Sequence, residues 1–331
     1  EGRDWSVMKI LITGGAGFIG SHLASELFER GHEITIIDNF STGRKDNLRH
    51  LAPNSGIRVE EGSILDAEVI EPLVADCDEV YHLAAAVGVR LILENPVETI
   101  MTNVRGAEVT LGLCRKHSKK IFIASTSEVY GKNNNGSLGE DDDRILGTTK
   151  KQRWAYANTK TLDEFLALAY HQAYGLPVVI ARLFNTVGPR QTGRYGMVIP
   201  NFVRAALDGK PICVFGSGKQ SRCFAHVNDV VKGIIGLMAH PDAVGDVFNV
   251  GNNEEITIEE LALRVKKLSG SSSEIQYIPY EEAYGDGYED MKRRVPSLKK
   301  IKGLIGYETR ERLDDILRSV IAYFRENASD S

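Results

Sequence analysis

The sequence predicts an α/β protein with a doubly wound parallel sheet and a smaller C-terminal lobe. Three observations lead to this fold class. Short runs of nearly all-apolar residues alternate with helical patterns through the first half of the chain. The first of these runs leads directly into a cluster of glycines. Beyond Gly188 the elements become shorter and are separated by prolines and glycines.

The first two strands are expected at Met8–Thr13 and Glu33–Asp38, because both runs are largely apolar and rich in β-branched residues. Ser21–Arg30 carries apolar residues at helical spacing and is followed by Gly31, which suits the end of a helix. Further strands are expected at Ile57–Glu60, Glu79–Ala85, Lys120–Thr126 and Pro177–Arg182, and further helices at Pro96–His117, Tyr156–Tyr174 and Leu313–Glu326. Strands that are apolar on both faces indicate a sheet covered by helices on both sides.

The chain is expected to divide near residue 187. Residues 1–187 are predicted to form the sheet domain, and residues 188–331 mainly a lobe that binds the substrate. The polar and acidic stretch Asn133–Gly147 is predicted to be a loop.

The composition excludes several classes of protein. With 331 residues, 42% of them hydrophobic, the chain is long enough for a sizeable core. The net charge of -5 is spread along the chain, so we expect no nucleic-acid partner. No apolar run approaches the roughly 18 residues of a membrane span, and Glu1–Val7 lacks the pattern of a signal peptide. The cysteines form no Cys-x-x-Cys pair, so we expect no metal site, no disulfide framework and a cytoplasmic location.

A dinucleotide-binding turn is predicted where the first strand meets the first helix. Gly14, Gly17 and Gly20 are spaced three residues apart around Phe18 and Ile19. Glycines at this spacing permit a tight turn, a close approach of the backbone to a pyrophosphate, and close helix–strand packing. The unpaired N–H groups at the helix N-terminus attract the anion. An ordinary strand–helix turn is the alternative for the motif taken alone.

Asp38 selects between the two nicotinamide dinucleotides. It ends the second predicted strand, 18 residues after Gly20, and is followed by Asn39. A carboxylate at this position accepts hydrogen bonds from the adenosine ribose hydroxyls and repels a 2′-phosphate, so we expect NAD. Arg44 is near enough in sequence to bind a 2′-phosphate, which is the one argument for NADP.

A candidate catalytic pair lies on a predicted helix. Tyr156 and Lys160 are four residues apart and therefore share a helix face. An ammonium beside a phenol lowers a pKa that is normally about 10, so Tyr156 becomes a candidate base toward an alcohol. Thr126 ends a predicted strand, at the edge where open α/β sheets bind ligands. For the Tyr–Lys pair alone, an amphipathic helix with a solvated lysine is the alternative.

In combination these motifs resemble the extended short-chain dehydrogenases/reductases, within the group of nucleotide-sugar epimerases, dehydratases and decarboxylases. The matches are Thr13–Gly20, Asp38–Asn39, His82–Ala85, Asn103, Ser125–Gly131, Tyr156-x-x-x-Lys160, Arg182–Arg190, Gly216–Arg222 and Arg294-x-Pro296. One departure is Ser63 before Ile64, where the family usually has Asp beside the adenine. The resemblance implies a Rossmann-type sheet, bound NAD, a UDP-sugar substrate, and a homodimer formed through the helices at Pro96–His117 and Tyr156–Tyr174.

The resemblance also implies roles for individual residues. Tyr156 would take the proton of the sugar 4-hydroxyl, Lys160 would hold the nicotinamide ribose, and Thr126 would bond the 4-oxygen. Ser127 and Glu128 complete the implied catalytic set. The implied cofactor contacts are Gly14, Gly17, Phe18, Ile19, Asp38, Asn39, Ser63, Ile64, Leu83, Ala84, Ala85, Asn103, Tyr156 and Lys160. The implied substrate contacts are Asn185, Arg194, Phe215, Gln220, Arg222 and Arg294.

The step after the 4-keto sugar separates the subfamilies. Ser127 stands where a 4,6-dehydratase has an acid, which argues against dehydration. Glu128 and Arg222 match the pattern of a UDP-glucuronate decarboxylase, a UDP-xylose synthase, whereas the segment Arg190–Val198 resembles hexuronate 4-epimerases, with Arg194 as a clamp for the C6 carboxylate. We expect 4-epimerisation of UDP-glucuronate or UDP-glucose, with decarboxylation as the alternative. A non-catalytic NAD-binding protein is a weaker alternative, because Thr126, Tyr156 and Lys160 are all present.

Overall fold

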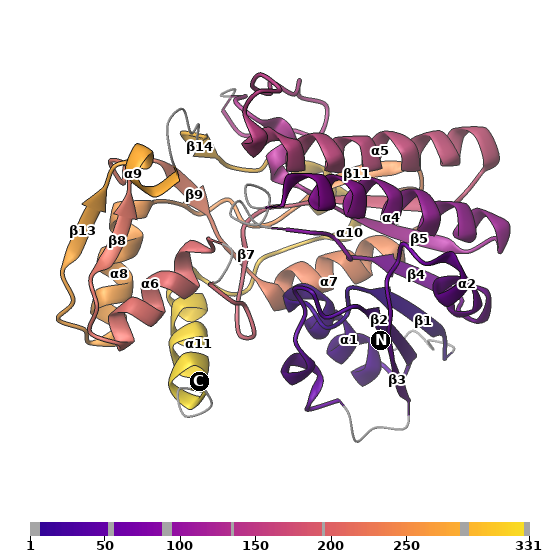
Figure 1. Ribbon diagram of the computed structural model, residues 1–331, viewed down its shortest axis with the longest axis horizontal. Helices are drawn as coiled ribbons and strands as arrows, with labels where there is room; N and C mark the ends of the chain where they lie inside the picture. Colours follow the sequence, from indigo (N-terminus) through magenta and orange to yellow (C-terminus); the bar gives the residue numbers. More distant parts are fainter. Residues whose placement is uncertain are drawn as a thin grey trace.

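The computed structural model describes residues 7–51, 56–87, 95–133, 136–193, 196–284 and 291–327. The larger part of the molecule is built on a seven-stranded parallel sheet (Figure 1), with strand order β11-β6-β5-β4-β1-β2-β3. The strands are β1 Lys9–Thr13, β2 Glu33–Asp38, β3 Ile57–Glu61, β4 Glu79–His82, β5 Lys120–Thr126, β6 Val178–Leu183 and β11 Asp246–Val250. The order reverses between β1 and β4, which opens a crevice at the carboxyl ends of the strands.

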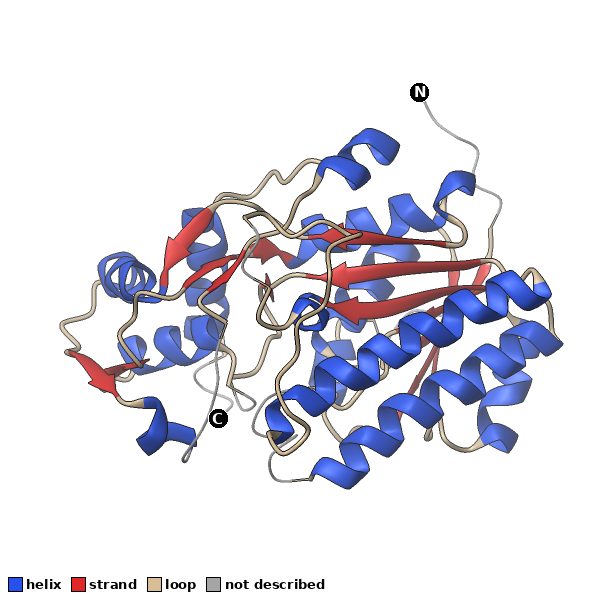
Figure 2. Ribbon diagram, turned by 90° about the horizontal axis from the view of Figure 1, so that it is seen from above, coloured by secondary structure: helices blue, strands red, loops and turns tan. Residues whose placement is uncertain are grey.

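Helices cover both faces of this sheet, which confirms the predicted doubly wound α/β class. On one face lie α2 (Ala67–Asp76), α4 (Pro96–Lys116) and α5 (Ala155–Tyr174), and on the other α1 (Phe18–Glu29), α7 (Val227–Met238) and α10 (Lys299–Ile305). In Figure 2, α4 and α5 run side by side along the front of the molecule.

The two helical layers follow from the alternation of side chains along each strand. In β1, Ile10 and Ile12 join the apolar cluster that includes α1 and α7, whereas Leu11 joins the cluster that includes α2, α4 and α5. In β5, Phe122 and Ile123 divide between the two clusters in the same way. Most residues of the central strands are therefore buried on both faces, as the continuous apolar runs predict.

A smaller lobe packs α6 (Val198–Leu207), α8 (Ile258–Ser269) and α11 (Leu313–Glu326) around its own apolar cluster. Its strand pairs and short helices are β7 Thr186–Val187, β8 Ile212–Phe215, β9 Ser221–Cys223, β10 Ala225–His226, β12 Glu255–Thr257, β13 Ile275–Ile278, β14 Arg293–Arg294 and α9 Tyr280–Tyr284. The single-turn 3-10 helices are η1 Lys45–Leu48, η2 Ser127–Tyr130, η3 Gln152–Trp154 and η4 Pro241–Ala243. Among the residues that the structure describes, no helix is both long enough and apolar enough to cross a bilayer.

The observed elements agree closely with those expected for the first half of the chain. The first helix starts three residues earlier than predicted, at Phe18, because Gly17 is extended and serves as its N-cap. β4 ends at His82 rather than Ala85, because the Ala84 N–H bonds to the Thr13 hydroxyl at 3.2 Å instead of extending the ladder. Beyond residue 187, α7 and β11 return to the large sheet. The division near residue 187 stays a prediction.

A buried ion pair ties the carboxyl ends of two strands to α5. Arg182 of β6 donates from Nε to Glu164 Oε1 at 2.9 Å and from Nη2 to Glu164 Oε2 at 2.8 Å. Ser125, at the end of β5, donates to the same carboxylate. Arg182 Nη1 also donates to the Tyr130 hydroxyl at 3.0 Å. Removing one charge from a buried pair strands the other, so the pair is a strong local constraint on this edge of the sheet.

Glu164→Gln is expected to lower the free energy of unfolding by about 3–5 kcal/mol, because it leaves the Arg182 guanidinium buried without a counter-charge. Asp208→Asn is the control, because it breaks an ion pair with Lys210 in which the Lys210 side chain is 72% exposed and that of Asp208 44%. It should change the free energy of unfolding by less than about 1 kcal/mol. Chemical denaturation measures both. Equal effects of the two substitutions would contradict the anchoring role of the buried pair.

Candidate active site

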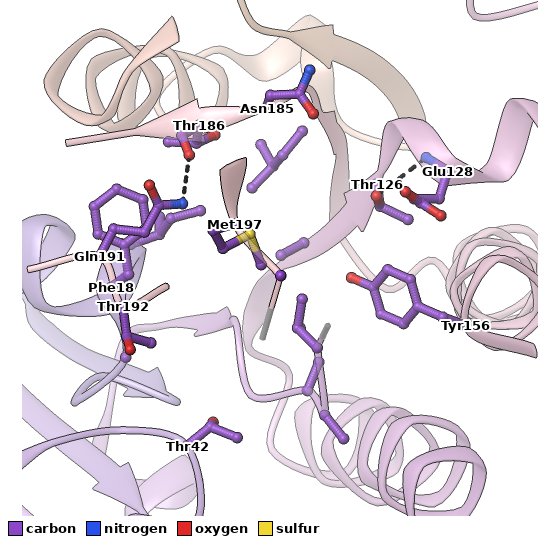
Figure 3. A pocket seen from close by; sticks show the side chains of 18 of the residues that line it. Phe18, Thr42, Thr126, Glu128, Tyr156, Asn185, Thr186, Gln191, Thr192 and Met197 are labelled. Atoms are coloured by element: carbon purple, nitrogen blue, oxygen red, sulfur yellow. Dashed lines mark hydrogen bonds between the residues drawn. The ribbon is translucent and has the colours of Figure 1, made fainter. Parts of the chain in front are cut away.

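A cavity of about 980 Å³ lies along the carboxyl edge of the sheet and continues into the smaller lobe. Its walls come from the glycine turn, the ends of β2, β4, β5 and β6, the first turn of α6, and β8. Figure 3 shows part of this wall, with Tyr156 and Thr126 on one side and Phe18 on the other. This volume suits a dinucleotide together with a second ligand. The described residues contain no group of three or more His, Cys, Asp or Glu side chains that could hold a metal ion.

The glycine turn brings backbone into contact with the ends of neighbouring strands. Gly14 has a φ of 71°, and a Cβ there would lie 2.8 Å from Ala84 Cα. A Cβ on Gly20 would lie 2.4 Å from the Gly14 carbonyl oxygen. Gly17 caps α1 without a side-chain hydrogen bond, so the first N–H groups of the helix remain available to an anion. The turn therefore fits a pyrophosphate and excludes side chains.

Asp38 ends β2 and lines the cavity. Its Oδ2 accepts from the Ala16 N–H at 2.9 Å and its Oδ1 from the Phe40 N–H at 2.8 Å. Burial raises the pKa of Asp38, while these two donors lower it. Arg44 instead pairs with Asp46 at 3.1 Å and is not among the described residues that line the cavity. Of Asp38 and Arg44, only the carboxylate lines the cavity.

Most of the expected cofactor contacts line the cavity, and two, Asn103 and Lys160, do not. Those that line it are Gly14, Gly17, Phe18, Ile19, Asp38, Asn39, Ser63, Ile64, Leu83, Ala84, Ala85 and Tyr156. Asn103 lies behind the wall, where its Oδ1 accepts from the Ala86 N–H at 2.8 Å and its Nδ2 donates to the Thr159 hydroxyl at 3.2 Å. The side chain of Asn103 thus braces the segment after β4 against α5.

Thr126 and Tyr156 come together at the end of β5, as the motifs predict. Thr126 caps η2 by accepting from the Glu128 N–H at 3.2 Å, an interaction drawn in Figure 3. The pKa of Tyr156 is raised, first by burial and then by the carboxylates of Glu128 and Asp163, while the Thr126 hydroxyl lowers it. The pKa of Tyr156 is thus raised, and not lowered as expected from the neighbouring Lys160.

The reason lies in the partner that Lys160 has. Its ammonium donates to Asp163 Oδ2 at 2.6 Å, one turn further along α5. The two side chains are 3% and 1% exposed. A carboxylate this close offsets the charge of the ammonium toward Tyr156. Lys160 does not line the cavity, so its expected contact with a nicotinamide ribose stays a prediction.

Glu128 occupies the centre of a cluster of three charges in the cavity wall. Its Oε2 accepts from Arg153 Nη1 at 2.6 Å and its Oε1 from Arg294 Nη1 at 2.6 Å. Burial would raise the pKa of Glu128, but the two guanidiniums outweigh it and hold the pKa at about 2. Glu128 is therefore a permanent carboxylate, which accepts hydrogen bonds and has no proton to give near neutral pH.

Most of the expected substrate residues line the same cavity. Those that line it are Asn185, Phe215, Gln220, Arg222 and Arg294, together with Ser127 of the catalytic set. Arg294 donates from Nη2 to Asn185 Oδ1 at 2.6 Å. Its Nε is buried without a hydrogen-bond partner, which leaves one donor for a ligand. Arg194 lies outside the described residues.

Arg153 and Gln191 are two of the polar cavity residues that the sequence analysis missed. Arg153 stands three residues before Tyr156, so the approach to that helix was a signal for it. Gln191 is 9% exposed, and its Nε2 donates to the Thr186 carbonyl at 3.0 Å (Figure 3). Its Oε1 is buried without a partner and can accept a hydrogen bond from a ligand. No spacing in the sequence indicates Gln191.

Comparison with known proteins gives one family match. The chain matches the model of the NAD dependent epimerase/dehydratase family over residues 10–251. The sequence-based resemblance to extended short-chain dehydrogenases/reductases is thereby confirmed. NAD as the cofactor is confirmed with it.

Similar proteins act on UDP sugars by name. A UDP-N-acetyl-alpha-D-glucosaminuronate decarboxylase of Bacillus cytotoxicus is 44% identical over 97% of this chain and 99% of its own length. UDP-glucuronic acid decarboxylase 1 of Xenopus tropicalis is 38% identical over 96% of this chain and 72% of its own. The solved UDP-glucuronic acid 4-epimerase of Bacillus cereus, in complex with UDP-glucuronic acid and NAD, is 30% identical with a TM-score of 0.87, covering 96% of this chain and 99% of that one.

These findings overturn the expected 4-epimerase activity and the assignment of the chain as an isomerase. The more similar relatives are decarboxylases, at 44% and 38% identity, while the epimerase structure stands at 30%. Too much weight was given to the segment Arg190–Val198, part of which lies outside the described residues. Glu128 was the better signal. Turning a ketone over requires no buried carboxylate, yet the fold holds this one between two guanidiniums.

The Glu128 cluster predicts a specific dependence of stability on pH. The pKa of the Glu128 carboxyl is about 4.3 in the unfolded chain and about 2 in the folded one. The ionised carboxylate therefore stabilises the fold at pH values above the unfolded pKa, and this stabilisation is lost as the pH falls toward 2. The difference in unfolding free energy between the parent and Glu128→Gln should be constant from about pH 7 to pH 5 and shrink below it. Denaturation at a series of pH values measures this. A difference that already changes between pH 7 and 6 would contradict it.

Proposed function

Because this chain belongs to the NAD-dependent epimerase/dehydratase family, we propose that it decarboxylates a UDP-hexuronate, oxidising C4 and releasing C6 as CO2. The observation that carries the proposal is the Glu128 carboxylate clasped between Arg153 and Arg294 beside Tyr156. The names of the similar decarboxylases support it.

The chain's own groups would bind the cofactor at the glycine turn. The backbone cradle at Gly14 and Gly20 fits the pyrophosphate, and Asp38 fits the adenosine ribose. NAD, when bound, accepts the hydride from C4 of the sugar and later returns it. The protein's part is to orient the sugar, to exclude water and to move the 4-hydroxyl proton.

Tyr156 and Thr126 would act on the 4-oxygen. The Tyr156 phenolate takes the proton of the 4-hydroxyl as the C4–H bond breaks, and the Thr126 hydroxyl donates to the same oxygen. The resulting 4-ketone is β to the C6 carboxylate. The electron pair of the C5–C6 bond then becomes the C4=C5 double bond, and the negative charge moves to the 4-oxygen. Tyr156, now protonated, and Thr126 stabilise that charge by hydrogen bonding.

The Glu128 cluster would act on the other side of the ring. Arg153 and Arg294 offset the charge of Glu128, so a second carboxylate can enter the cavity beside it. Arg294 Nε, which lacks a protein partner, offers a charged donor to the uronate. C5 must then regain a proton before the hydride returns to C4. Glu128, with a pKa of about 2, can align a water for this step by accepting its hydrogen bond.

The substituent at C2 of the sugar divides the two substrate candidates. One similar decarboxylase is named for the 2-acetamido sugar and the other for glucuronate itself. We propose the UDP-hexuronate class as a whole and leave the choice at C2 to the experiment.

Tyr156→Phe is expected to lower the rate of CO2 release from UDP-glucuronate or UDP-N-acetylglucosaminuronate by about 10²–10⁴-fold, because the base is lost. Bound NAD should remain, since the ring is kept. Mass spectrometry of the products measures loss of CO2, and NMR reads the configuration at C4. The matched control is Tyr170→Phe on the same helix, which should leave the rate unchanged. A product of unchanged mass, or no turnover of either sugar, would sink the proposal.

We also propose a homodimer formed through α4 and α5. Both helices carry large exposed apolar side chains, with exposed fractions of 74% for Val97, 38% for Ile100, 47% for Leu162 and 57% for Phe165. Figure 2 shows the two helices side by side on the outside of the molecule. Exposed apolar side chains of this size on two neighbouring helices are typical of an interface between subunits.

Phe165→Asp is expected to convert the dimer to a monomer at micromolar concentration, because it places a charge in the middle of that apolar face. Sedimentation velocity measures the mass. Leu263→Asp, on α8 of the smaller lobe, is the control: Leu263 is 54% exposed and its replacement should leave the mass unchanged. A monomeric parent protein would rule out the interface.

A further inference from the structure

Gln191 carries a buried polar atom to which the proposed reaction gives no role. The residue is 9% exposed and lines the cavity. Its Nε2 donates to the Thr186 carbonyl at 3.0 Å, and because a carbonyl oxygen only accepts, this bond fixes the direction of the amide. Oε1 is buried and has no hydrogen-bond partner. A buried acceptor without a donor is costly, so a bound molecule that supplies a donor is stabilised here.

The backbone just before Gln191 has an unusual conformation. Arg190 has a φ of 68°, in the left-handed region that residues other than glycine rarely adopt. His22 Nε2 of α1 donates to the Pro189 carbonyl at 2.9 Å, and Arg190 Nη1 donates to the Ser25 hydroxyl of the same helix at 3.5 Å. The segment is thus bonded to α1, while the next residue, Gln191, lines the cavity. A strained backbone of this kind persists where the surrounding structure enforces it, often at a ligand site.

The position of Gln191 suits the nicotinamide half of a bound dinucleotide. The free N–H groups at the start of α1, at Phe18, fit the pyrophosphate, and the nicotinamide ring must reach Tyr156, where the sugar is oxidised. Figure 3 shows Gln191 on the same side of the cavity as Phe18, with Tyr156 across from both. A nicotinamide riboside that runs from Phe18 to Tyr156 therefore starts beside the wall that holds Gln191.

The chemistry of Oε1 selects among the groups of the ligands. Phosphate and carboxylate oxygens only accept at neutral pH, so they cannot bond to this atom. The nicotinamide carboxamide carries two N–H donors in a fixed plane, as an amide side chain does. The lining residues Val187, Met197 and Val198, which flank Gln191 in the chain, are apolar. An apolar wall with one acceptor fits an aromatic ring with one amide better than a sugar with several hydroxyls.

We propose that Gln191 Oε1 accepts a hydrogen bond from the carboxamide of the bound nicotinamide and so fixes the rotation of the ring about its glycosidic bond. The rotation decides which face of the ring the sugar meets. The bond from Gln191 to the Thr186 carbonyl holds the acceptor in place before the cofactor binds. The inference rests on the proposed function only in placing the ring beside Tyr156.

The experiment is a competition between NAD and 3-acetylpyridine adenine dinucleotide, in which an acetyl group without N–H donors replaces the carboxamide. The purified protein is equilibrated with mixtures of the two, and the bound nucleotides are released by acid and quantified by chromatography. The ratio of the two dissociation constants follows directly. The parent protein should prefer NAD by about tenfold, the effect of one buried hydrogen bond. Gln191→Met, which has similar length but no acceptor, should lose most of this preference.

The comparison of two dinucleotides removes effects that have nothing to do with the carboxamide. Losing the bond to Thr186 weakens the binding of both nucleotides equally and cancels in the ratio. Gln276→Leu is the matched control, because Gln276 is an exposed glutamine on β13 that does not line the cavity, and it should keep the full preference. Gln191→Asn, which keeps an amide but draws it back by one bond, is the second variant if Gln191→Met does not fold. It should lose preference too.

An unchanged preference for NAD in the Gln191 variants would overturn the proposal. Equal weakening of both dinucleotides would do the same, because it would assign Oε1 to a ribose hydroxyl. A higher KM for the UDP sugar with the preference intact would assign the atom to a sugar hydroxyl, again against the proposal. The competition needs no turnover, so its result is independent of whether the protein decarboxylates a UDP-hexuronate.

Discussion

Compensation of buried charge is the constraint on which the architecture of this cavity depends. Three buried carboxylates on η2 and α5 are each paired with a base: Glu128 with Arg153 and Arg294, Asp163 with Lys160, and Glu164 with Arg182. A buried ion costs several kcal/mol unless its partner is well placed. The ends of β5, β6, β14 and α5 are therefore held in one relative arrangement, and the cavity wall is held with them.

The same pairs determine the protonation states in the cavity. Two guanidiniums keep Glu128 ionised at every physiological pH, although burial opposes this. Tyr156 is pushed the other way, because burial and two nearby carboxylates favour its neutral form. The Glu128 carboxylate and the Tyr156 phenol both line the cavity, although 28 residues separate them in the chain. Glu128 is thus kept ionised as a hydrogen-bond acceptor, whereas Tyr156 is kept protonated. Opposite shifts of neighbouring groups are the usual mark of an acid–base site.

The sequence predicted the parts of the site that depend on local geometry. Gly14, Gly17 and Gly20 were found because a tight turn against a strand admits no other residue, and Tyr156 and Lys160 because a helix repeats every four residues. Asp163 was missed because the importance of its ion pair with Lys160 depends on burial, which the periodicity of the sequence does not show. Arg294 was expected only as a substrate contact, yet it also donates to Glu128, which lies 166 residues earlier in the chain.

By itself, the sequence determined the alternation of strands and helices, the position of the glycine turn and the presence of an acid after the second strand. These are properties of short segments, and apolar pattern and backbone sterics decide them within about 20 residues. The tertiary structure alone decided which base faces each carboxylate, that Lys160 is paired with Asp163, and that Asn103 lies behind the wall. Those outcomes are set by contacts between segments far apart in the chain, where electrostatic energy depends on separation and burial and not on sequence distance.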